Sequence, residues 1–283
     1  MPEILTSDLL LRQAKKIRAN RSLGQNFFVD LELLTKIAEA VDIEESDHIV
    51  EIGPGLGFLT KLLCGRGATV DAIELDRNLA EKLSKHGLKS VNIINADFLE
   101  YDLSSIQAEK IKVVGNIPYQ ITSPIIAKLF GEIGEPSPWL AKIDRVVMTI
   151  QMEVARRLVA VPGTKAFSPI SLLKSYYFDA EILFSVPPSA FYPVPEVTSA
   201  VVYLNPLPAP PVEVADLKLF RKIIKGGFKQ RRKMLKNNLS FLGLSEKELL
   251  DLFEELNLSP HARAEDLSLQ KYALLANSLS NQS

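Results

Sequence analysis

The sequence is poor in the residues that build disulfides and metal centres. It contains one cysteine, Cys64, in 283 residues, so a disulfide within the chain is excluded. Its three histidines, His48, His86 and His261, lie far apart in the sequence. Zinc and related metals are usually held by clustered histidine and cysteine side chains. We therefore expect no metal site of this kind.

Long apolar runs are also absent. No stretch of about 18 apolar residues occurs, so we expect no membrane-spanning helix and no membrane partner. The first 16 residues carry acidic residues ahead of their apolar run, unlike a secretory signal. These features predict a cytoplasmic protein. A composition of 47% hydrophobic and 24% charged residues is that of a globular chain, long enough for one large core and a smaller domain.

Acidic residues are missing from two segments, although the net charge is only −1. Residues 9–29 and 217–245 contain 14 of the 33 basic residues, so the other 19 face all 34 acidic residues. Such segregation favours an acidic partner, and nucleic acid is the one we expect. Two solvated helix faces are the alternative. The basic residues concerned are Arg12, Lys15, Lys16, Arg18, Arg21, Lys218, Arg221, Lys222, Lys225, Lys229, Arg231, Arg232, Lys233 and Lys236.

Short apolar strands alternate with helical patterns through the first two thirds of the chain. This alternation predicts an α/β fold with a doubly wound, mostly parallel seven-stranded sheet. The strands are predicted at 48–52, 69–75, 91–96, 111–116, 144–151, 176–186 and 197–204. Helices are predicted after the glycine turn that begins at 53, at 76–87 and at 123–134, where Pro124 falls in the first turn.

A proline-rich stretch at 205–213 has the composition of a linker. Beyond it only helical patterns occur, at 216–228, 231–243 and 246–257. We therefore predict two domains, residues 1–206 and 207–283, of which the second is small and all-helical.

The loop after the first predicted strand carries glycines at positions 53, 55 and 57. Glycines at this place let the backbone approach a ligand closely. Glu74 lies 21 residues after Gly53, at the end of the second strand, where an acid suits two ribose hydroxyls. The dinucleotide fingerprint requires a third glycine where this chain has Phe58, which weakens a nicotinamide oxidoreductase interpretation. The spacing suits a nucleoside ligand without a pyrophosphate.

Two further polar positions follow the third and fourth strands. Asp97 comes after the third strand, where a carboxylate can accept a hydrogen bond from an adenine amine, or simply cap a turn. The fourth strand ends in Asn116-Ile117-Pro118-Tyr119, a stiff turn that places an amide beside a flat ring. This turn suits a planar substrate.

Taken together, these motifs resemble a class I S-adenosylmethionine-dependent methyltransferase. The Asn-x-Pro-aromatic turn is similar to that of enzymes that methylate exocyclic amines. Three further stretches, at 22–30, 191–202 and 228–239 with 263–277, resemble the bacterial small-subunit rRNA adenine N6,N6-dimethyltransferase family. The resemblance runs from about residue 21 to residue 277.

The resemblance implies roles for particular side chains. Those expected to bind S-adenosylmethionine are Asn26, Phe28, Gly53, Glu74, Asp97 and Asn116. Those expected to hold the target adenine are Asn116, Pro118 through its carbonyl, Tyr119, and Phe191 on the other face of the base. The chain departs from the family pattern at Phe28, Gln120 and Thr198, which leaves local packing and RNA fit open.

The implied activity is transfer of methyl groups from S-adenosylmethionine to the N6 amines of two adjacent adenosines in the 3′-terminal hairpin loop of small-subunit (16S) rRNA. The implied partner is the immature small ribosomal subunit, and we expect a monomer. Two alternatives stay open: a large-subunit rRNA methyltransferase of the macrolide-resistance type, and a non-catalytic nucleic-acid-binding relative. The second is disfavoured because the residues of the motifs are intact: Asn116, Pro118, Tyr119, Glu74 and Asp97.

The basic cluster at 228–239 is predicted to form one helix. At 3.6 residues per turn, Lys229, Arg232, Lys233 and Lys236 would share a face. With Arg231, these residues are the expected RNA contacts.

Overall fold

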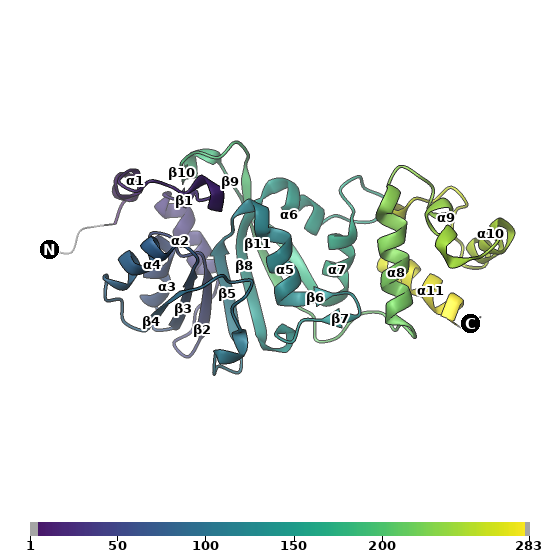
Figure 1. Cartoon of the computed structure of the whole chain (residues 1–283), viewed down its shortest axis with the longest axis horizontal. Helices are drawn as coiled ribbons and strands as arrows, with labels where there is room; N and C mark the ends of the chain where they lie inside the picture. The colour runs from purple at the N-terminus through teal and green to yellow at the C-terminus, as the bar shows by residue number, and fades with distance from the viewer. Residues whose placement is uncertain (1–4, 281–283) are drawn as a thin grey trace. The chain divides into compact units, whose positions relative to one another are not determined.

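The computed structural model describes residues 5–280, which divide into two compact units (Figure 1). The first unit comprises the chain up to Gly131, together with Ser137–Ala155 and Ala180–Pro206. The second comprises Glu132–Pro136, Arg156–Asp179 and the chain from Leu207 onward. The second unit thus takes in two segments that precede the proline-rich stretch.

A seven-stranded sheet forms the centre of the first unit, in the order β4-β3-β2-β5-β8-β11-β9. Strands β4, β3, β2, β5 and β8 run parallel, and β11 is antiparallel to β8. The predicted α/β fold with a mostly parallel seven-stranded sheet is confirmed. The strands are β2 (His48–Ile52), β3 (Thr69–Glu74), β4 (Val91–Asn95), β5 (Ile111–Asn116), β8 (Ile143–Gln151), β9 (Phe178–Val186) and β11 (Ser199–Pro206).

Helices cover the sheet because its central strands are apolar on both faces, as parallel sheets require. Ile49, Val50, Val113 and Val114 are at most 1% exposed. Aspartate caps help to fix where the helices begin; for example, the Asp76 carboxylate accepts the Asn78 backbone N–H at the start of α4. The helices of this part of the chain are α1 (Ser7–Lys15), α2 (Leu31–Ala40), α3 (Phe58–Cys64), α4 (Arg77–Ser84), α5 (Thr122–Phe130) and α6 (Met152–Leu158).

A two-stranded sheet joins segments that lie far apart in the sequence. Strand β1 (Phe27–Phe28) pairs antiparallel with β10 (Phe191–Tyr192). The Val29 N–H also donates to the Ala190 carbonyl at 2.8 Å. The N-terminal segment is thereby fixed beside the loop that precedes β11.

The helix predicted at 123–134 is shorter than expected. It ends at Phe130, because Gly131 adopts a φ of 85° that breaks the helical hydrogen-bond pattern. Residues 131–136 instead form a small hairpin of β6 (Gly131–Glu132) and β7 (Glu135–Pro136). The strand predicted at 176–186 likewise begins later, because Tyr176 and Tyr177 complete a preceding helix.

The second unit is helical apart from the β6–β7 hairpin and the start of β9. Its helices are α7 (Pro169–Tyr177), α8 (Leu217–Gly227), α9 (Leu235–Asn238), α10 (Glu246–Glu255) and α11 (Leu269–Ser280), with α6 ending in this unit. Its core includes Phe220, Phe253 and Tyr272, all at most 1% exposed.

The single helix predicted over the basic cluster is wrong. Residues 228–230 form a 3-10 turn, 231–233 form a turn, and α9 then has only four residues. The Leu235 N–H donates to the Ala262 carbonyl at 2.7 Å, so it cannot bond the residue four positions before it. The Asn238 amide also binds the Gly227 and Gln230 carbonyls. The four lysines and arginines therefore do not follow one helical stripe.

None of the helices within residues 5–280 combines the length and the hydropathy that a membrane crossing demands.

Candidate functional site

A pocket opens within the first unit, where the parallel strands β2, β3, β5 and β8 reach their carboxyl ends. Ligands of open α/β sheets bind at this edge. Its walls come from β1, the glycine loop, the ends of these strands and Phe191. The pocket brings together the residues expected to hold cofactor and base: Asn26, Phe28, Gly53, Glu74, Asp97, Asn116, Pro118, Tyr119 and Phe191.

The glycine loop leaves room for a ligand at its first glycine. Gly53 has a φ of 66°, which side-chain-bearing residues rarely adopt. Apart from Gly53 itself and its two chain neighbours, no protein atom lies within 4 Å of the position that a Cβ would occupy at this residue. The backbone at Gly53 therefore borders open space, as a loop that cradles a small molecule should.

Glu74 is fixed at the end of β3 by the loop that it faces. Its two carboxylate oxygens accept the backbone N–H groups of Gly55 at 2.9 Å and Asp76 at 2.8 Å. Burial raises the pKa of Glu74, and these two hydrogen bonds oppose the rise. Each oxygen has a second lone pair, so the carboxylate can still accept hydroxyl groups.

Asp97 combines a turn role with a free acceptor. Its Oδ1 accepts the Leu99 N–H at 2.8 Å, as a turn-capping aspartate does. Within residues 5–280, Oδ2 accepts no hydrogen bond from the protein, and the residue lines the pocket. Both interpretations of this residue are therefore compatible with its geometry.

Asn116 is oriented by a bond to the N-terminal segment. Its Nδ2 donates to the Asn26 carbonyl at 2.9 Å, which leaves Oδ1 as an acceptor at the pocket. Gly115 allows this strand end to pack closely, because a Cβ there would lie 2.5 Å from the Ile52 carbonyl oxygen. The Ile117 N–H donates to the Thr149 carbonyl at 3.1 Å. The turn that follows β5 is thus held from two sides.

Aromatic rings border the same space. The Tyr119 hydroxyl bonds the Ser199 hydroxyl at 2.7 Å, and burial raises the Tyr119 pKa, so the phenol stays neutral. Phe191 is 2% exposed and its ring centroid lies 4.7 Å from that of Phe28. Phe28 therefore packs against the ring that the resemblance assigns to stacking on the base, and because Phe191 is buried, a stacking role requires side chains around it to move.

Two buried polar residues of the pocket, Glu51 and Thr149, have no role among those predicted from the sequence. Their side chains are 2% and 1% exposed, and within the described chain neither Glu51 Oε2 nor Thr149 Oγ1 has a hydrogen-bond partner. Burial raises the pKa of Glu51 to about 8; the neighbouring Thr60 hydroxyl opposes the rise, and the Glu74 carboxylate adds to it. An unsatisfied buried polar atom costs about 1–3 kcal/mol, so such atoms in a pocket indicate a polar ligand.

The two residues differ in whether a sequence signal could have identified them as pocket residues. Glu51 stands two positions before the glycine loop, which is a detectable signal. Thr149 is found only through the strand pairing, in which it lies opposite Asn116. Paired residues point to the same face of a sheet, so Thr149 and Asn116 share the face that lines the pocket.

Comparison with known proteins decides the family. The ribosomal RNA adenine dimethylase family model matches residues 16–281. Relatives named ribosomal RNA small subunit methyltransferase A are 40% identical in Alkaliphilus metalliredigens, over 92% of this chain and 91% of the relative. In Caldanaerobacter subterraneus the identity is 39%, over 93% of this chain and 98% of the relative. The chain belongs to the ribosomal RNA adenine dimethylase family. As a member, it is a methyltransferase whose cofactor is S-adenosylmethionine.

Solved structures agree with this family assignment. The 23S rRNA methyltransferase ErmE has a TM-score of 0.69 and 25% identity, over 90% of this chain and all of that chain. A dimethyladenosine transferase from Plasmodium falciparum has a TM-score of 0.74 and 23% identity, over 89% of this chain and 96% of that chain. The dimethylase fold is therefore shared across the chain.

The pocket fits S-adenosylmethionine, which combines a nucleoside with a charged amino-acid end. The open space beside Gly53 and the unpartnered atoms of Glu51 and Thr149 are the features that a polar ligand would fill. Glu74 and Asp97 offer acceptors for hydroxyl and amine groups.

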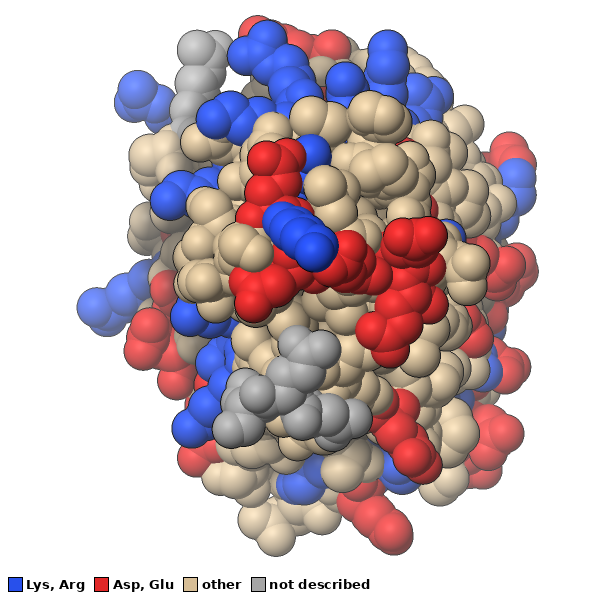
Figure 2. Space-filling model, turned by 90° about the vertical axis from the view of Figure 1, so that its right-hand side faces the viewer, with Lys and Arg blue, Asp and Glu red and all other residues tan. Residues whose placement is uncertain are grey.

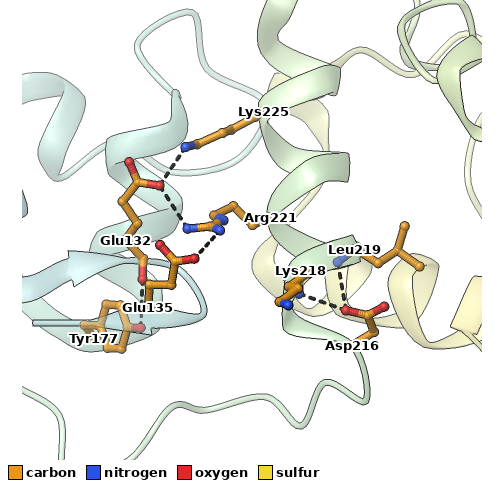
Figure 3. Close-up of polar contacts among 8 residues, drawn as sticks. All are labelled: Glu132, Glu135, Tyr177, Asp216, Lys218, Leu219, Arg221 and Lys225. Atoms are coloured by element: carbon orange, nitrogen blue, oxygen red, sulfur yellow. Dashed lines mark hydrogen bonds and ion pairs between the residues drawn. The ribbon is translucent and has the colours of Figure 1, made fainter.

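The basic residues of the second unit are only partly available to a ligand. Arg221 pairs with Glu132 and Glu135, and Lys225 pairs with Glu132 at 2.6 Å (Figure 3). Lys236 pairs with Glu246 at 2.7 Å. These three cations are neutralised by acids of the same unit.

Among the expected RNA contacts, Arg231 already makes hydrogen bonds within the protein. Its guanidinium donates to the Lys165 and Phe167 carbonyls, each at 2.8 Å. Lys229, Arg232 and Lys233 are exposed, and none of the three forms an ion pair in the described part of the chain.

Removal of the pocket acids should weaken cofactor binding. Glu74→Ala and Asp97→Ala are each expected to cost roughly 1–3 kcal/mol of binding free energy, because each removes a charged hydrogen-bond acceptor. Isothermal titration calorimetry with S-adenosylmethionine measures the change. Glu39→Gln, an exposed residue outside the pocket, serves as the control. Unchanged affinity in both alanine variants would contradict the assigned roles.

Proposed function

We propose that the chain dimethylates the N6 amines of two adjacent adenosines in the 3′-terminal hairpin loop of small-subunit rRNA. The observation that carries the proposal is the orientation of Asn116, whose Nδ2 is bound to the Asn26 carbonyl so that Oδ1 is left as an acceptor at the pocket. An exocyclic amine has two hydrogens to donate, and the chain offers a second acceptor next to the first. The small-subunit target is supported by the names of the relatives.

The second acceptor is a carbonyl of the turn after Asn116. The Pro118 carbonyl already accepts the Ile121 N–H at 3.1 Å, whereas that of Ile117 accepts no hydrogen bond within residues 5–280. A carbonyl has two lone pairs, so either oxygen can receive the amine. Two acceptors on the two hydrogens favour a pyramidal nitrogen, whose lone pair is then available for reaction.

S-adenosylmethionine supplies an electrophilic methyl group on a sulfonium. Its holders are proposed to be Asn26, Phe28, Gly53, Glu74, Asp97 and Asn116. The residues of the chain contribute positioning and electrostatics rather than a strong base. The methylated amine is acidic enough to lose its proton readily, so neither Asn116 nor Tyr119 has to remove it before transfer.

Tyr119 is proposed to hold the plane of the adenine. Its hydroxyl is fixed by Ser199, which orients the ring without involving the reacting amine. The adenine must leave its stack to enter, and aromatic side chains compensate for part of the stacking energy that it gives up. Phe191 is proposed to provide the second aromatic face once side chains around it move.

The test is the destination of a labelled methyl group. The chain is incubated with labelled S-adenosylmethionine and either immature small-subunit particles or large-subunit rRNA. Label in dimethyladenosine of the small-subunit RNA supports the proposal. Label only in large-subunit RNA would favour the macrolide-resistance type of activity, which the similarity to ErmE keeps as the second candidate. No transfer to either RNA would favour a non-catalytic role.

We further propose that the chain acts in the cytoplasm, as a monomer, on the immature small subunit. Residues 1–206 would carry catalysis, and 207–283 would contact rRNA. The exposed Lys229, Arg232 and Lys233 support the second assignment. In Figure 2, acidic side chains gather across the middle of the face at the α10 end, and their negative charge disfavours phosphate contacts there.

Reversing two exposed charges should weaken rRNA binding. Arg232→Glu with Lys233→Glu is expected to flatten the plot of log affinity against log salt by about 0.7–0.9 for each phosphate that the chain no longer neutralises. Cofactor affinity should not change, since both side chains lie outside the pocket. Filter binding across a salt series measures the slope. An unchanged slope in a folded variant would identify these residues as a solvated surface.

A further inference from the structure

The first acid-free segment of the chain forms a basic surface of its own. Residues 9–29 contain no acidic residue, and α1 with the segment that follows it carries Arg12, Lys15, Lys16 and Arg18. All four side chains are exposed. Within residues 5–280, none of them forms an ion pair. We call these four residues the α1 basic surface.

The other side of α1 is committed to the core. Leu10 and Ala14 are fully buried in the cluster that contains Phe28 and Phe191. The Ser7 hydroxyl accepts the Leu31 N–H at 2.9 Å, which joins the start of α1 to the start of α2. The helix is therefore fixed in orientation, and the cations project away from the packed side.

The α1 basic surface is close to the pocket along the chain and in space. Residues 22–28 form one wall of the pocket, and Ser22 follows Lys16 by only six positions. Helix α1 also packs against β10, whose Phe191 lines the pocket. Figure 1 shows α1 beside β1 and β10 in the first unit.

Interactions within the protein account for only some of the four cations of the α1 basic surface. Arg12 and Lys15 lie in the last turn of α1, where cations are stabilised by the helix dipole. Lys16 and Arg18 lie beyond the helix. The contrast with the second unit is informative, because there Arg221, Lys225 and Lys236 have acidic partners in their own unit. The α1 basic surface lacks such partners among the described residues.

We propose that the α1 basic surface binds phosphates of the RNA strand that flanks the target adenosine. This inference rests on the proposed function, since it concerns the RNA whose adenosine enters the pocket. A base that leaves its stack keeps its backbone at the mouth of the pocket, where neighbouring phosphates need cations. Phosphate contacts position the strand without reading its sequence. The α1 basic surface thus positions the RNA strand at the pocket, and Asn116 and Tyr119 bind the adenine base.

The test uses the full-length chain with three reversed charges, Arg12→Glu, Lys15→Glu and Lys16→Glu. We expect the slope of log RNA affinity against log salt to fall by about 2–3, at about 0.7–0.9 per phosphate. Cofactor affinity by calorimetry and the single-turnover rate at saturating RNA should match those of the unchanged chain. The matched control is Lys82→Glu, Lys85→Glu and Lys89→Glu, which makes the same change of net charge on exposed lysines of the same unit.

The outcomes separate this inference from the proposed function. If the unchanged chain methylates small-subunit particles but the α1 variant keeps its salt slope, the inference alone is overturned. An equal decrease of slope in the control also overturns it, because the effect is then one of net charge. If the unchanged chain transfers no methyl group, the proposed function fails first. The milder variant Lys15→Gln with Lys16→Gln, expected to lower the slope by about 1.4–1.8, applies where the triple variant does not fold.

Discussion

Asn116→Ala is expected to lower the single-turnover rate of methyl transfer about 10²–10³-fold, the range seen when one preorganised group is removed from a reacting centre. The decrease follows from the removal of Oδ1, the acceptor that the bond to Asn26 holds at the pocket. RNA affinity should fall much less, because Asn116 is not among the exposed basic residues. Rapid-quench measurement at saturating cofactor and RNA isolates the chemical step.

The matched variant for this measurement is Tyr119→Phe. It keeps the aromatic ring and removes a hydroxyl that bonds Ser199 and not the reacting amine. Its rate should stay within several-fold of the unchanged chain. Cofactor affinity of Asn116→Ala is measured in parallel, because removal of the bond to Asn26 can loosen the pocket wall. A near-normal rate for Asn116→Ala under saturating conditions would remove Asn116 from the mechanism.

Glu51→Gln is expected to stabilise the cofactor-free chain at alkaline pH. The pKa of Glu51 is about 8 in the folded chain, against an ordinary value of 4.5. Between these values the folded state binds more protons than the unfolded state, so the free energy of unfolding falls as pH rises. The slope attributable to Glu51 is at most about 1.4 kcal/mol per pH unit. The variant has no carboxyl at this position and does not show that slope.

Thermal melting of both chains from pH 5 to pH 9 checks this expectation. The variant should melt several degrees above the unchanged chain at pH 9, and the difference should shrink toward pH 5. Glu39→Gln, at an exposed position, should follow the unchanged chain throughout. A constant difference between the Glu51 variant and the unchanged chain across the range would show that Glu51 does not titrate there.

The sequence predicts the pocket well because its signals are local and its geometry follows from topology. Gly53, Glu74, Asp97 and Asn116 each lie at the end of a separate parallel strand or just after it, and parallel strands end at one edge of the sheet. The alternation of strands and helices is therefore enough to bring them together. Thr149 has no such signal, since its relation to Asn116 depends on the pairing of β5 with β8.

The errors occur where long-range contacts override local propensity. Residues 228–239 have helical composition, yet the Leu235 N–H bonds the Ala262 carbonyl and Arg231 bonds the carbonyls of 165 and 167. Neither of these contacts can be predicted from the spacing of the basic residues. The count of basic residues is misleading for the same reason, because acids far away in the sequence neutralise several of them. These contacts are tertiary, and a periodicity argument does not contain them.

The hairpin of β6 and β7 has a consequence for how this unit can evolve. Glu132 forms ion pairs with both Arg221 and Lys225, and Glu135 forms an ion pair with Arg221. A single substitution at position 132 would therefore remove the ion pair of Lys225 and one of the two ion pairs of Arg221, while Glu135 would remain close enough to act on both charges. Arg221 and Lys225 are thus positive charges that are now paired within the unit, and one codon change at position 132 would make them more available to a polyanion. Under the proposed role of this unit in rRNA binding, a substitution of Glu132 would raise the affinity for RNA without adding a basic residue.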